Sequence, residues 1–322
     1  MGSTPAIEAI DLVKRFKSTT AVDGVSFTVP PGTVLGLLGP NGAGKTTTVR
    51  MMTTLSEPTS GTARVAGYDV RKDPDMVRRS MGLTGQVATV DELLTGRENI
   101  RMIGSLYGIR RKELARLGDE LLKQFAIADA ADRPVKSYSG GMRRRLDLAV
   151  SLLAGPPVLF LDEPTTGLDP RSRTDLWDVL RGLVREGTTL LLTTQYLEEA
   201  DQLADNIVVM DKGRIIAEGT PLRLKQQAGN ASLVVTVSRA DDLGAAKALL
   251  GKTGVEVFVD AGARQLTAAA DGLADMTRVA GWLRDSDIDV DDIGLSRPSL
   301  DDVFLTLTGR RTEAEAIEGS AV

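Results

Sequence analysis

Residues 39–46, Gly-Pro-Asn-Gly-Ala-Gly-Lys-Thr, constrain the fold of this chain more than any other stretch. They fit the phosphate-binding pattern G-x-x-x-x-G-K-[ST] at every fixed position. The apolar residues 33–38 before them predict a strand buried on both faces of a parallel sheet, and residues 47–55 after them have the length of a helix. Strand, glycine loop and helix are the setting that the pattern requires, so the sequence predicts a nucleotide-binding fold.

The residue types of the loop suit phosphate binding. Gly39, Gly42 and Gly44 let successive backbone N–H groups turn inward, where they and the positive helix end can hold phosphates. Lys45 would reach the β- and γ-phosphates as a point charge, and the Thr46 hydroxyl would bind Mg²⁺. The alternative, a glycine-rich turn with an accidental lysine, is disfavoured by the two flanking elements.

Composition narrows the chemistry that the chain can perform. The 322 residues suffice for two domains, and they include no cysteine and no histidine. Disulfides, a thiolate nucleophile, the commonest metal ligand and the commonest general base are therefore excluded. Residues 1–11 lack the pattern of a signal peptide, and no apolar run approaches the roughly 20 residues that cross a bilayer, so we expect a soluble chain.

The net charge of −5 is unevenly distributed along the chain. Residues 231–322 hold 16 acidic and 9 basic side chains, which leaves 28 and 30 for residues 1–230. Such asymmetry indicates two units with different roles. Because phosphate contacts require clustered cations, the acidic second unit argues against a nucleic acid as partner.

A pair of carboxylates follows a second buried strand. Residues 158–161 are wholly apolar and lead into Asp162-Glu163-Pro164. The carboxyl end of a buried parallel strand is where α/β folds place ligand chemistry. Asp162 suits a direct or water-mediated Mg²⁺ contact, and Glu163 can polarise a water for attack on a γ-phosphate. Two solvated loop acids are the alternative, which the preceding strand disfavours.

A Ser-Gly-Gly turn at residues 139–141 precedes a segment with apolar residues at helical spacing. This turn would form a second anion-binding helix start, although the motif is weak by itself. Three arginines follow directly, and we expect at least two of them to form a solvated helix face: Arg143, Arg144 and Arg145.

These motifs, in their order, resemble the nucleotide-binding subunit of ATP-binding cassette (ABC) transporters over about residues 5–225. The set comprises residues 39–46, Gln86, residues 139–141, Leu161-Asp162-Glu163-Pro164 and Gly167-Leu168-Asp169. Tyr138 and Met142 stand where the family usually has leucine and glutamine, and Gln195 stands where it usually has histidine. The segments around these three positions are similar to the daunorubicin-resistance exporter ATPases, in which glutamine is the normal residue.

The resemblance implies roles for individual residues. Phe16, which periodicity alone leaves as either core or a ring that stacks on adenine, becomes the adenine-stacking residue. Glu163, Gln195 and Lys45 are implied as catalytic, and Asp169 as the residue that joins two sites across a dimer. The implied ATP contacts are Phe16, Gly39, Pro40, Asn41, Gly42, Ala43, Gly44, Lys45, Thr46, Thr47 and Gln86. The implied Mg²⁺ ligands are Thr46, Gln86 and Asp162, and Ser139, Gly140, Gly141 and Met142 would bind ATP held by the opposite subunit.

The implied fold class is α/β. Residues 1–230 would form a P-loop NTPase cassette with a RecA-like parallel sheet, an antiparallel β subdomain and an α-helical signature subdomain. Residues 231–309 alternate strand and helix patterns in the order β-α-β-β-α-β, which predicts a small ferredoxin-like α+β domain. A linker is expected near residues 220–230 and a disordered tail at 310–322. Fold grounds leave open whether the second domain only stabilises a dimer or regulates partner assembly.

The resemblance implies an ATP-hydrolysing exporter subunit that uses ATP and Mg²⁺. It would act as a head-to-tail homodimer on a separate integral membrane permease, peripheral to the cytoplasmic face of the membrane, with residues 87–99 at the docking site of a permease helix. The implied cargo is an amphipathic drug or lipid. Two alternatives stay open: an ATP-gated switch with little turnover, which Gln195 permits, and a repair or translation ATPase, whose second cassette or long insertions this chain lacks.

Overall fold

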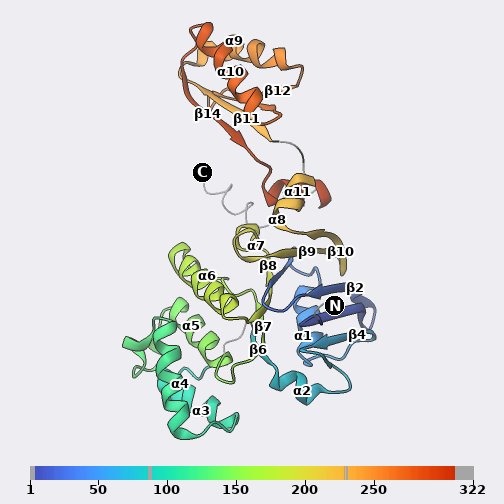
Figure 1. Cartoon of the computed structure of the whole chain (residues 1–322), viewed down its shortest axis with the longest axis vertical. Helices are drawn as coiled ribbons and strands as arrows, with labels where there is room; N and C mark the ends of the chain where they lie inside the picture. Colours follow the sequence, from blue (N-terminus) through green and yellow to red (C-terminus); the bar gives the residue numbers. More distant parts are fainter. Residues whose placement is uncertain (1–3, 86–88, 228, 230, 309–322) are drawn as a thin grey trace. The chain divides into compact units, whose positions relative to one another are not determined.

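The computed structural model describes residues 4–85, 89–227, 229 and 231–308. The described residues divide into two compact units, the first ending at Pro221 and the second beginning at Leu222. No helix among these residues is both long and apolar enough to span a bilayer. Figure 1 shows the elements of each unit.

The first unit is built on a six-stranded sheet with the order β10-β9-β3-β8-β7-β6. Its parallel strands β3, β7 and β8 consist of buried residues throughout, as the apolar runs predict. The strand bounds are β3 Val34–Leu38, β6 Met81–Thr84, β7 Val158–Asp162, β8 Thr189–Thr194, β9 Asn206–Asp211 and β10 Arg214–Gly219. Because β3, β7 and β8 run parallel in adjacent positions, their carboxyl ends lie at one edge of the sheet.

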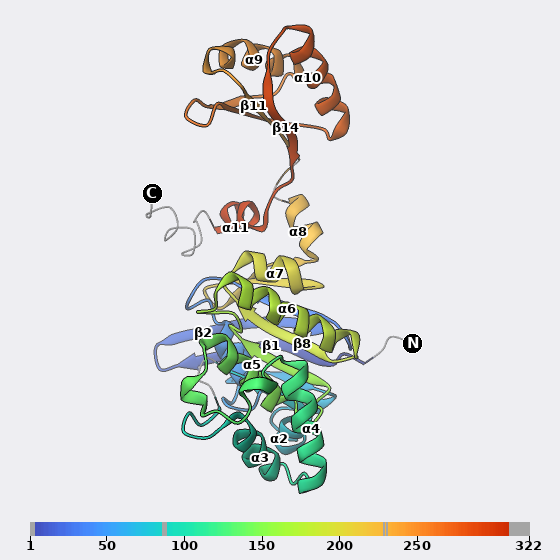
Figure 2. The ribbon, with the colours of Figure 1, turned by 90° about the vertical axis from the view of Figure 1, so that its left-hand side faces the viewer.

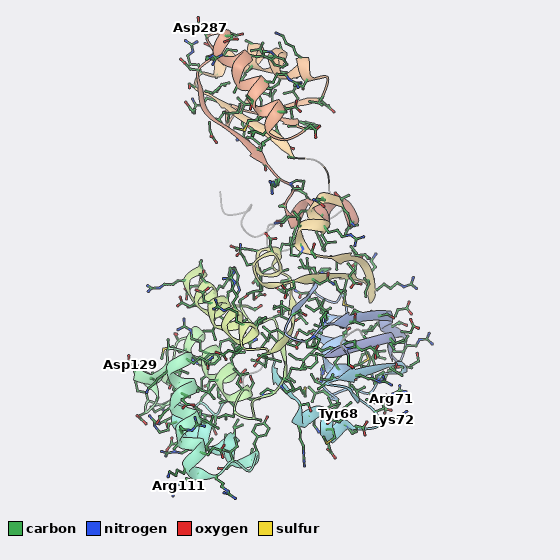
Figure 3. All side chains as sticks on the ribbon, in the orientation of Figure 1. Tyr68, Arg71, Lys72, Arg111, Asp129 and Asp287 are labelled. Atoms are coloured by element: carbon green, nitrogen blue, oxygen red, sulfur yellow. The ribbon has the colours of Figure 1, made fainter. Side chains whose placement is uncertain are left out.

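An antiparallel sheet of order β2-β1-β4-β5 forms the second layer of this unit. It comprises β1 Ile7–Phe16, β2 Thr19–Val29, β4 Ser60–Val65 and β5 Tyr68–Asp69. Helix α1 (Lys45–Met52) buries Val49, Met51 and Met52 in a core shared by both sheets. Tyr68, Arg71 and Lys72 lie at the outer edge of the antiparallel sheet (Figure 3). A short helix, α2 (Pro74–Arg79), leads from this layer to β6.

Helices α3 (Gly96–Leu106), α4 (Arg111–Gln124) and α5 (Gly140–Ser151) form a helical group on the other side of the central sheet (Figure 1). Helix α3 begins at Gly96, and Gly104 lies inside it without breaking it. Gly104 serves packing instead, because a Cβ there would overlap the side chain of Leu114 on α4. A real break occurs at Gly108, whose φ is +74°.

Helices α6 (Pro170–Arg185) and α7 (Leu197–Leu203) contact each other, and α7 packs on β3 and β8. Figure 2 shows both helices beside β8. The sequence analysis assigned no helix to either segment. Two short 3₁₀ turns, Ala128–Ala130 and Val135–Ser137, join α4 to α5.

The second unit contains an antiparallel sheet of order β12-β13-β11-β14, with α9 and α10 contributing to its core. Its chain order β-α-β-β-α-β confirms the ferredoxin-like prediction. Residues 221–227, expected as linker, form helix α8 instead. The bounds are α8 Pro221–Gln227, β11 Ser232–Val237, α9 Leu243–Leu250, β12 Val257–Asp260, β13 Gln265–Ala269, α10 Leu273–Asp285, β14 Val290–Ser296 and α11 Leu300–Thr308, with 3₁₀ turns at Ala240–Asp242 and Gly251–Thr253.

The glycine contact between α3 and α4 gives a stability prediction. We expect Gly104→Ala to destabilise the fold by roughly 1–3 kcal/mol, because the new methyl group overpacks against Leu114. Gly182→Ala is the matched control, since a Cβ at this helical glycine of α6 meets nothing within 4 Å, and it should stabilise by about 0.4–1 kcal/mol. Urea unfolding midpoints measure both changes, and shifts in the same direction would contradict this account of the packing.

Candidate nucleotide site

The phosphate loop connects β3 to α1 and lies against two other strands. A Cβ on Gly44, whose φ is +102°, would lie 2.5 Å from the carbonyl oxygen of Ala21. A Cβ on Gly39 would overlap the carbonyl oxygen of Met210 at the end of β9. Larger residues are therefore excluded at both positions, and the backbone of the loop is held close to β2 and β9.

Lys45 begins α1, and its side chain lies inside the loop. The Nζ donates hydrogen bonds to the carbonyl oxygens of Gly39 at 2.7 Å and Pro40 at 3.1 Å. The residue is 4% exposed, whereas Asn41 and Gly42 at the tip of the loop are exposed. The ammonium group is thus positioned where the pattern expects a phosphate-binding charge.

The carboxylate of Asp162, at the end of β7, is bonded to the start of α1 and to the end of β8. Its Oδ1 accepts hydrogen bonds from Thr46 Oγ1 at 3.1 Å and from Thr193 Oγ1 at 2.5 Å. Asp162 is 5% exposed, so these hydroxyls supply hydrogen bonds that a buried carboxylate needs. Carboxylate and hydroxyl oxygens are the hard ligands that Mg²⁺ prefers, so Asp162 and Thr46 fit this metal. Thr193 was not predicted from the sequence, although its position at the end of an apolar strand was an available signal.

Glu163 follows in a left-handed backbone conformation with a φ of +50°. This region costs a residue with a Cβ roughly 1–2 kcal/mol. Its N–H donates to the carbonyl oxygen and to Oγ1 of Thr193, both at 3.1 Å, and its Oε2 accepts from Thr166 Oγ1 at 3.3 Å. Strain of this kind is characteristic of functional sites, and here it turns the chain sharply at the predicted catalytic carboxylate.

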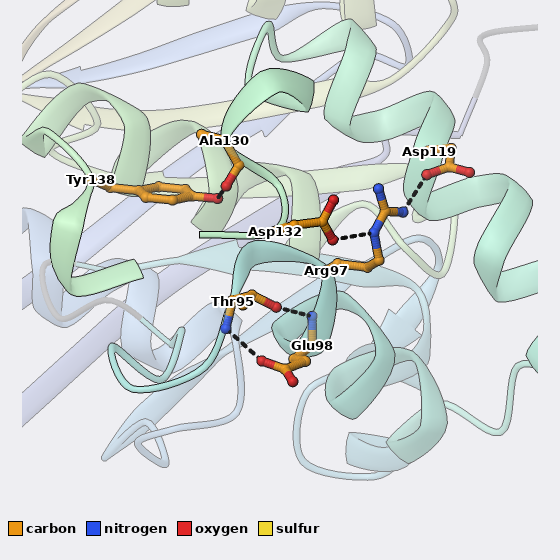
Figure 4. Close-up of polar contacts among 7 residues, drawn as sticks. All are labelled: Thr95, Arg97, Glu98, Asp119, Ala130, Asp132 and Tyr138. Atoms are coloured by element: carbon orange, nitrogen blue, oxygen red, sulfur yellow. Dashed lines mark hydrogen bonds and ion pairs between the residues drawn. The ribbon is translucent and has the colours of Figure 1, made fainter. Parts of the chain in front are cut away.

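The Ser-Gly-Gly turn forms the start of α5 as predicted. Ser139 is the N-cap, and its Oγ accepts from the N–H of Met142 at 3.2 Å. Tyr138 is buried, and its hydroxyl donates to the carbonyl oxygen of Ala130 at 2.6 Å (Figure 4). The tyrosine hydroxyl therefore has a partner in the core, which explains how tyrosine fits at this position.

The segments around Tyr138 are held by charged groups (Figure 4). Arg97 pairs with Asp119 at 2.5 Å and with Asp132 at 2.9 Å, and these hydrogen bonds raise the pKa of the guanidinium above its usual value. Thr95 and Glu98 form a capping box at the start of α3. The helical group that presents residues 139–141 is therefore fixed by contacts within itself.

The remaining predicted residues lie at element ends. Asp169 caps α6 and accepts from the N–H of Ser172 at 2.9 Å, which lowers the pKa of its carboxyl. Gln195 directly follows β8 and is half-buried. Phe16 ends β1 and is 51% exposed, with the Lys14 ammonium 5.0 Å from its ring centroid, so it is not a core residue. Thr47 is half-buried in α1, and Gln86 lies outside the described residues.

The expectation that the three arginines form a solvated face is wrong. Arg144 donates to three backbone carbonyls, and Arg145 pairs with Asp175 at 2.7 Å. Their side chains are 13% and 16% exposed, compared with 38% for Arg143, which pairs with Glu92. Consecutive helical residues point in directions about 100° apart, so a run of three cannot occupy one face.

The chain is 50% identical over 319 residues to the daunorubicin/doxorubicin resistance ATP-binding protein DrrA of Streptomyces peucetius, covering 99% of this chain and 97% of that protein. The family profile described as ABC transporter matches residues 22–166. This chain belongs to the ATP-binding subunits of ABC transporters.

Further relatives agree with this assignment. The doxorubicin resistance ATP-binding protein DrrA of Mycobacterium tuberculosis is 46% identical over 307 residues, 94% of this chain and 93% of that protein. The Nod factor export ATP-binding protein I of Ralstonia nicotianae is 40% identical over 318 residues, 96% of each chain. The predicted resemblance to drug-exporter ATPases is confirmed, and the chain is an ABC-family ATPase that binds ATP.

Solved structures confirm the cassette fold. An ATP-binding subunit of an ABC transporter matches with a TM-score of 0.63 and 29% identity, covering 70% of this chain and 93% of the other. CbiO1 of Clostridium perfringens, part of the cbiONQ transporter complex, matches with a TM-score of 0.65 and 26% identity, covering 70% and 92%.

The ABC subunit also buries a glutamate that the sequence analysis missed. Glu199 on α7 is 1% exposed, and its Oε1 accepts from Trp177 Nε1 on α6 at 3.4 Å. Among the described residues its Oε2 has no hydrogen-bond partner. Burial raises the pKa of this carboxyl. The sequence does not mark Glu199 as buried, because the exposed residue beside it, Glu198, is of the same type.

A raised pKa makes stability depend on pH with a definite sign. The folded state keeps the Glu199 proton to higher pH than the unfolded state does. The contribution of this proton to the free energy of unfolding is therefore complete at acidic pH and is lost as the pH rises. Glu199→Gln removes this titration. We therefore expect the difference in thermal midpoint, variant minus wild type, to increase as the pH is raised from about 5 to about 8. Glu198→Gln is the exposed control on the same helix. An equal pH response in wild type and Glu199→Gln would refute the assignment.

Proposed function

We propose that this protein is the ATP-hydrolysing subunit of an exporter, which works as a head-to-tail homodimer on a separate integral membrane permease. The observation that carries the proposal is the shared Asp162 oxygen, which accepts hydrogen bonds from both Thr46 and Thr193 beside the strained Glu163. This arrangement collects a metal ligand set and a carboxylate base next to the phosphate loop.

Asp162 and Thr46 would hold Mg²⁺, which supplies charge neutralisation on the transferring phosphoryl group. Lys45 replaces its two carbonyl contacts, to Gly39 and Pro40, with contacts to the β- and γ-phosphates. The residues of the loop thus bind and orient the phosphates, and the N-terminus of α1 adds its positive dipole end.

Glu163 orients the attacking water and accepts its proton. The Gln195 amide donates a hydrogen bond to the γ-phosphate from the neighbouring end of β8. A neutral amide cannot become cationic, so this residue orients the phosphate without adding charge. In the dimer, the α5 start at Ser139, Gly140 and Gly141 of one subunit contacts the γ-phosphate of ATP held by the other, and Asp169 links the two sites.

A surface hollow on the helical group suits the permease. A cavity of about 840 Å³ lies between α2, α3 and α4, and its lining includes Arg78, Arg79, Leu106, Tyr107 and Leu117. Leu106 is 83% exposed and Tyr107 is 48% exposed, so two adjacent apolar side chains are available at the lining of this groove. Arg111 extends from the same end of the group (Figure 3). An amphipathic permease helix would fit this groove. The docking segment that the resemblance implies, residues 87–99, contributes none of the lining residues, and its first two residues lie outside the described residues.

The cargo proposal depends on the relatives. Their names include daunorubicin and doxorubicin resistance and Nod factor export. We therefore propose an amphipathic drug or lipid as cargo, carried by the permease at the cytoplasmic face of the membrane. An ATP-gated switch without turnover is the second candidate, which the neutral Gln195 favours.

Phosphate release tests the catalytic proposal. We expect Glu163→Gln to reduce Mg²⁺-dependent phosphate release by about 100-fold or more while ATP still binds, because the general base is lost. Gln195→His serves as a matched variant that should retain turnover, since imidazole can also donate to phosphate. Both are measured on the purified subunit with and without its permease. Release that survives in Glu163→Gln would refute the base assignment, and ATP binding without release in wild type would favour the switch.

The groove proposal has its own test. We expect Leu106→Asp to weaken co-purification with the permease by about tenfold or more, because a carboxylate replaces an apolar anchor. Leu273→Asp is the control, since Leu273 is 68% exposed on the second unit. ATP binding by the isolated subunit checks folding of both variants. Equal recovery of the permease with both variants would show that the groove is not the docking surface.

A further inference from the structure

Arg144 lies on α5, in the second turn after the Ser-Gly-Gly start, and its guanidinium contacts the catalytic strand end. The Nη2 donates to the carbonyl oxygen of Asp162 at 3.1 Å, and the Nε donates to that of Pro164 at 2.9 Å. These two carbonyls belong to the residues immediately before and after Glu163. The guanidinium therefore holds both flanks of the residue whose backbone is in the left-handed region.

The same guanidinium reaches a third chain segment. Its Nη1 donates to the carbonyl oxygen of Gly85, the residue after β6, at 2.6 Å. Asp147, one turn further along α5, lies 3.8 Å from Nη1 and accepts from the N–H of Thr89 at 2.8 Å. Gly85 and Thr89 are thus both bonded to one turn of α5.

Three hydrogen bonds to carbonyls in different directions require an arginine at position 144. A guanidinium presents five N–H donors in a fixed plane, so it can serve three carbonyls in different directions, whereas an ammonium is a point charge on a flexible stem. Arg144 is largely buried, with its side chain 13% exposed, and burial lowers the pKa of the guanidinium. A buried cation with three carbonyl partners fixes its neighbours more firmly than a solvated one.

We infer that Arg144 is a positioning residue for hydrolysis: it holds the strained turn at Glu163 and couples it to the helix that begins at Ser139. This inference rests on the proposed role of Glu163. Any displacement of α5 that follows nucleotide contact at Ser139 is transmitted through Arg144 to the carbonyls of Asp162 and Pro164. Turnover, rather than ATP binding, therefore depends on this side chain.

Three variants test the inference in the full-length protein. Arg144→Gln and Arg144→Lys should both lower kcat by about 10- to 100-fold with little change in KM or in the affinity for a fluorescent ATP analogue, because misplacement of the base affects the chemical step. Arg116→Gln is the matched control, since Arg116 is a solvent-exposed arginine on α4 that pairs with Glu120. Thermal midpoints show whether each variant is folded.

Chemical rescue separates positioning from general stability. Free guanidinium, added far below denaturing concentrations, should restore part of the kcat of Arg144→Ala and leave Arg116→Ala unchanged. Wild-type kcat in Arg144→Gln, or loss of ATP affinity in parallel with kcat, would overturn the inference. Glu163→Gln is measured beside them: if Glu163→Gln is inactive and Arg144→Gln is fully active, only the inference fails, whereas an active Glu163→Gln refutes the proposed function itself.

Discussion

The parallel pairing of β3, β7 and β8 is the constraint on which the nucleotide site depends. Leu38 pairs with Thr194, and Asp162 pairs with Thr193, so these strands end at the same level. The shared edge brings Thr46, which follows β3, within hydrogen-bond distance of the Asp162 carboxylate. A buried carboxylate is costly without such partners, so the strand register and the hydroxyls stabilise each other. A shift in register would separate the phosphate loop from the acids.

Helix α5 connects this edge to the rest of the cassette. Its N-cap is Ser139, its second turn carries Arg144, and Tyr138 just before it is bonded to Ala130 in the helical group. One helix therefore shares contacts with the proposed signature turn, with the strand end that carries Glu163 and with the helical group. Because helices pack as rigid elements, this shared helix is the physical basis of the coupling that we propose through Arg144.

The features that were predicted correctly are those that depend on residues close together in the sequence. The buried strands followed from apolar runs, and the phosphate loop followed from glycine spacing, because both depend on residues adjacent in sequence. Helix α6 was missed although Asp169-Pro170 is a typical N-cap and first-turn pair. The packing role of Gly104 could not be predicted from the sequence, because it depends on Leu114, ten residues away on another helix. The inward direction of Arg144 could likewise not be predicted, since the carbonyls that accept its hydrogen bonds lie just after β6 and at the end of β7.

The lack of histidine has a consequence for how this ATPase responds to pH. Histidine is the side chain whose ordinary pKa lies near neutrality, so without it a change of side-chain charge between about pH 6 and 8 requires a group with a displaced pKa. Burial raises the pKa of Asp147 and of Glu199. Asp147 lies beside Arg144, and Glu199 lies on the helix that follows Gln195. Both acids thus lie beside elements of the proposed site, Asp147 beside the arginine that holds the turn at Glu163 and Glu199 on the helix after Gln195, so protonation of either acid would act on the positions of these elements.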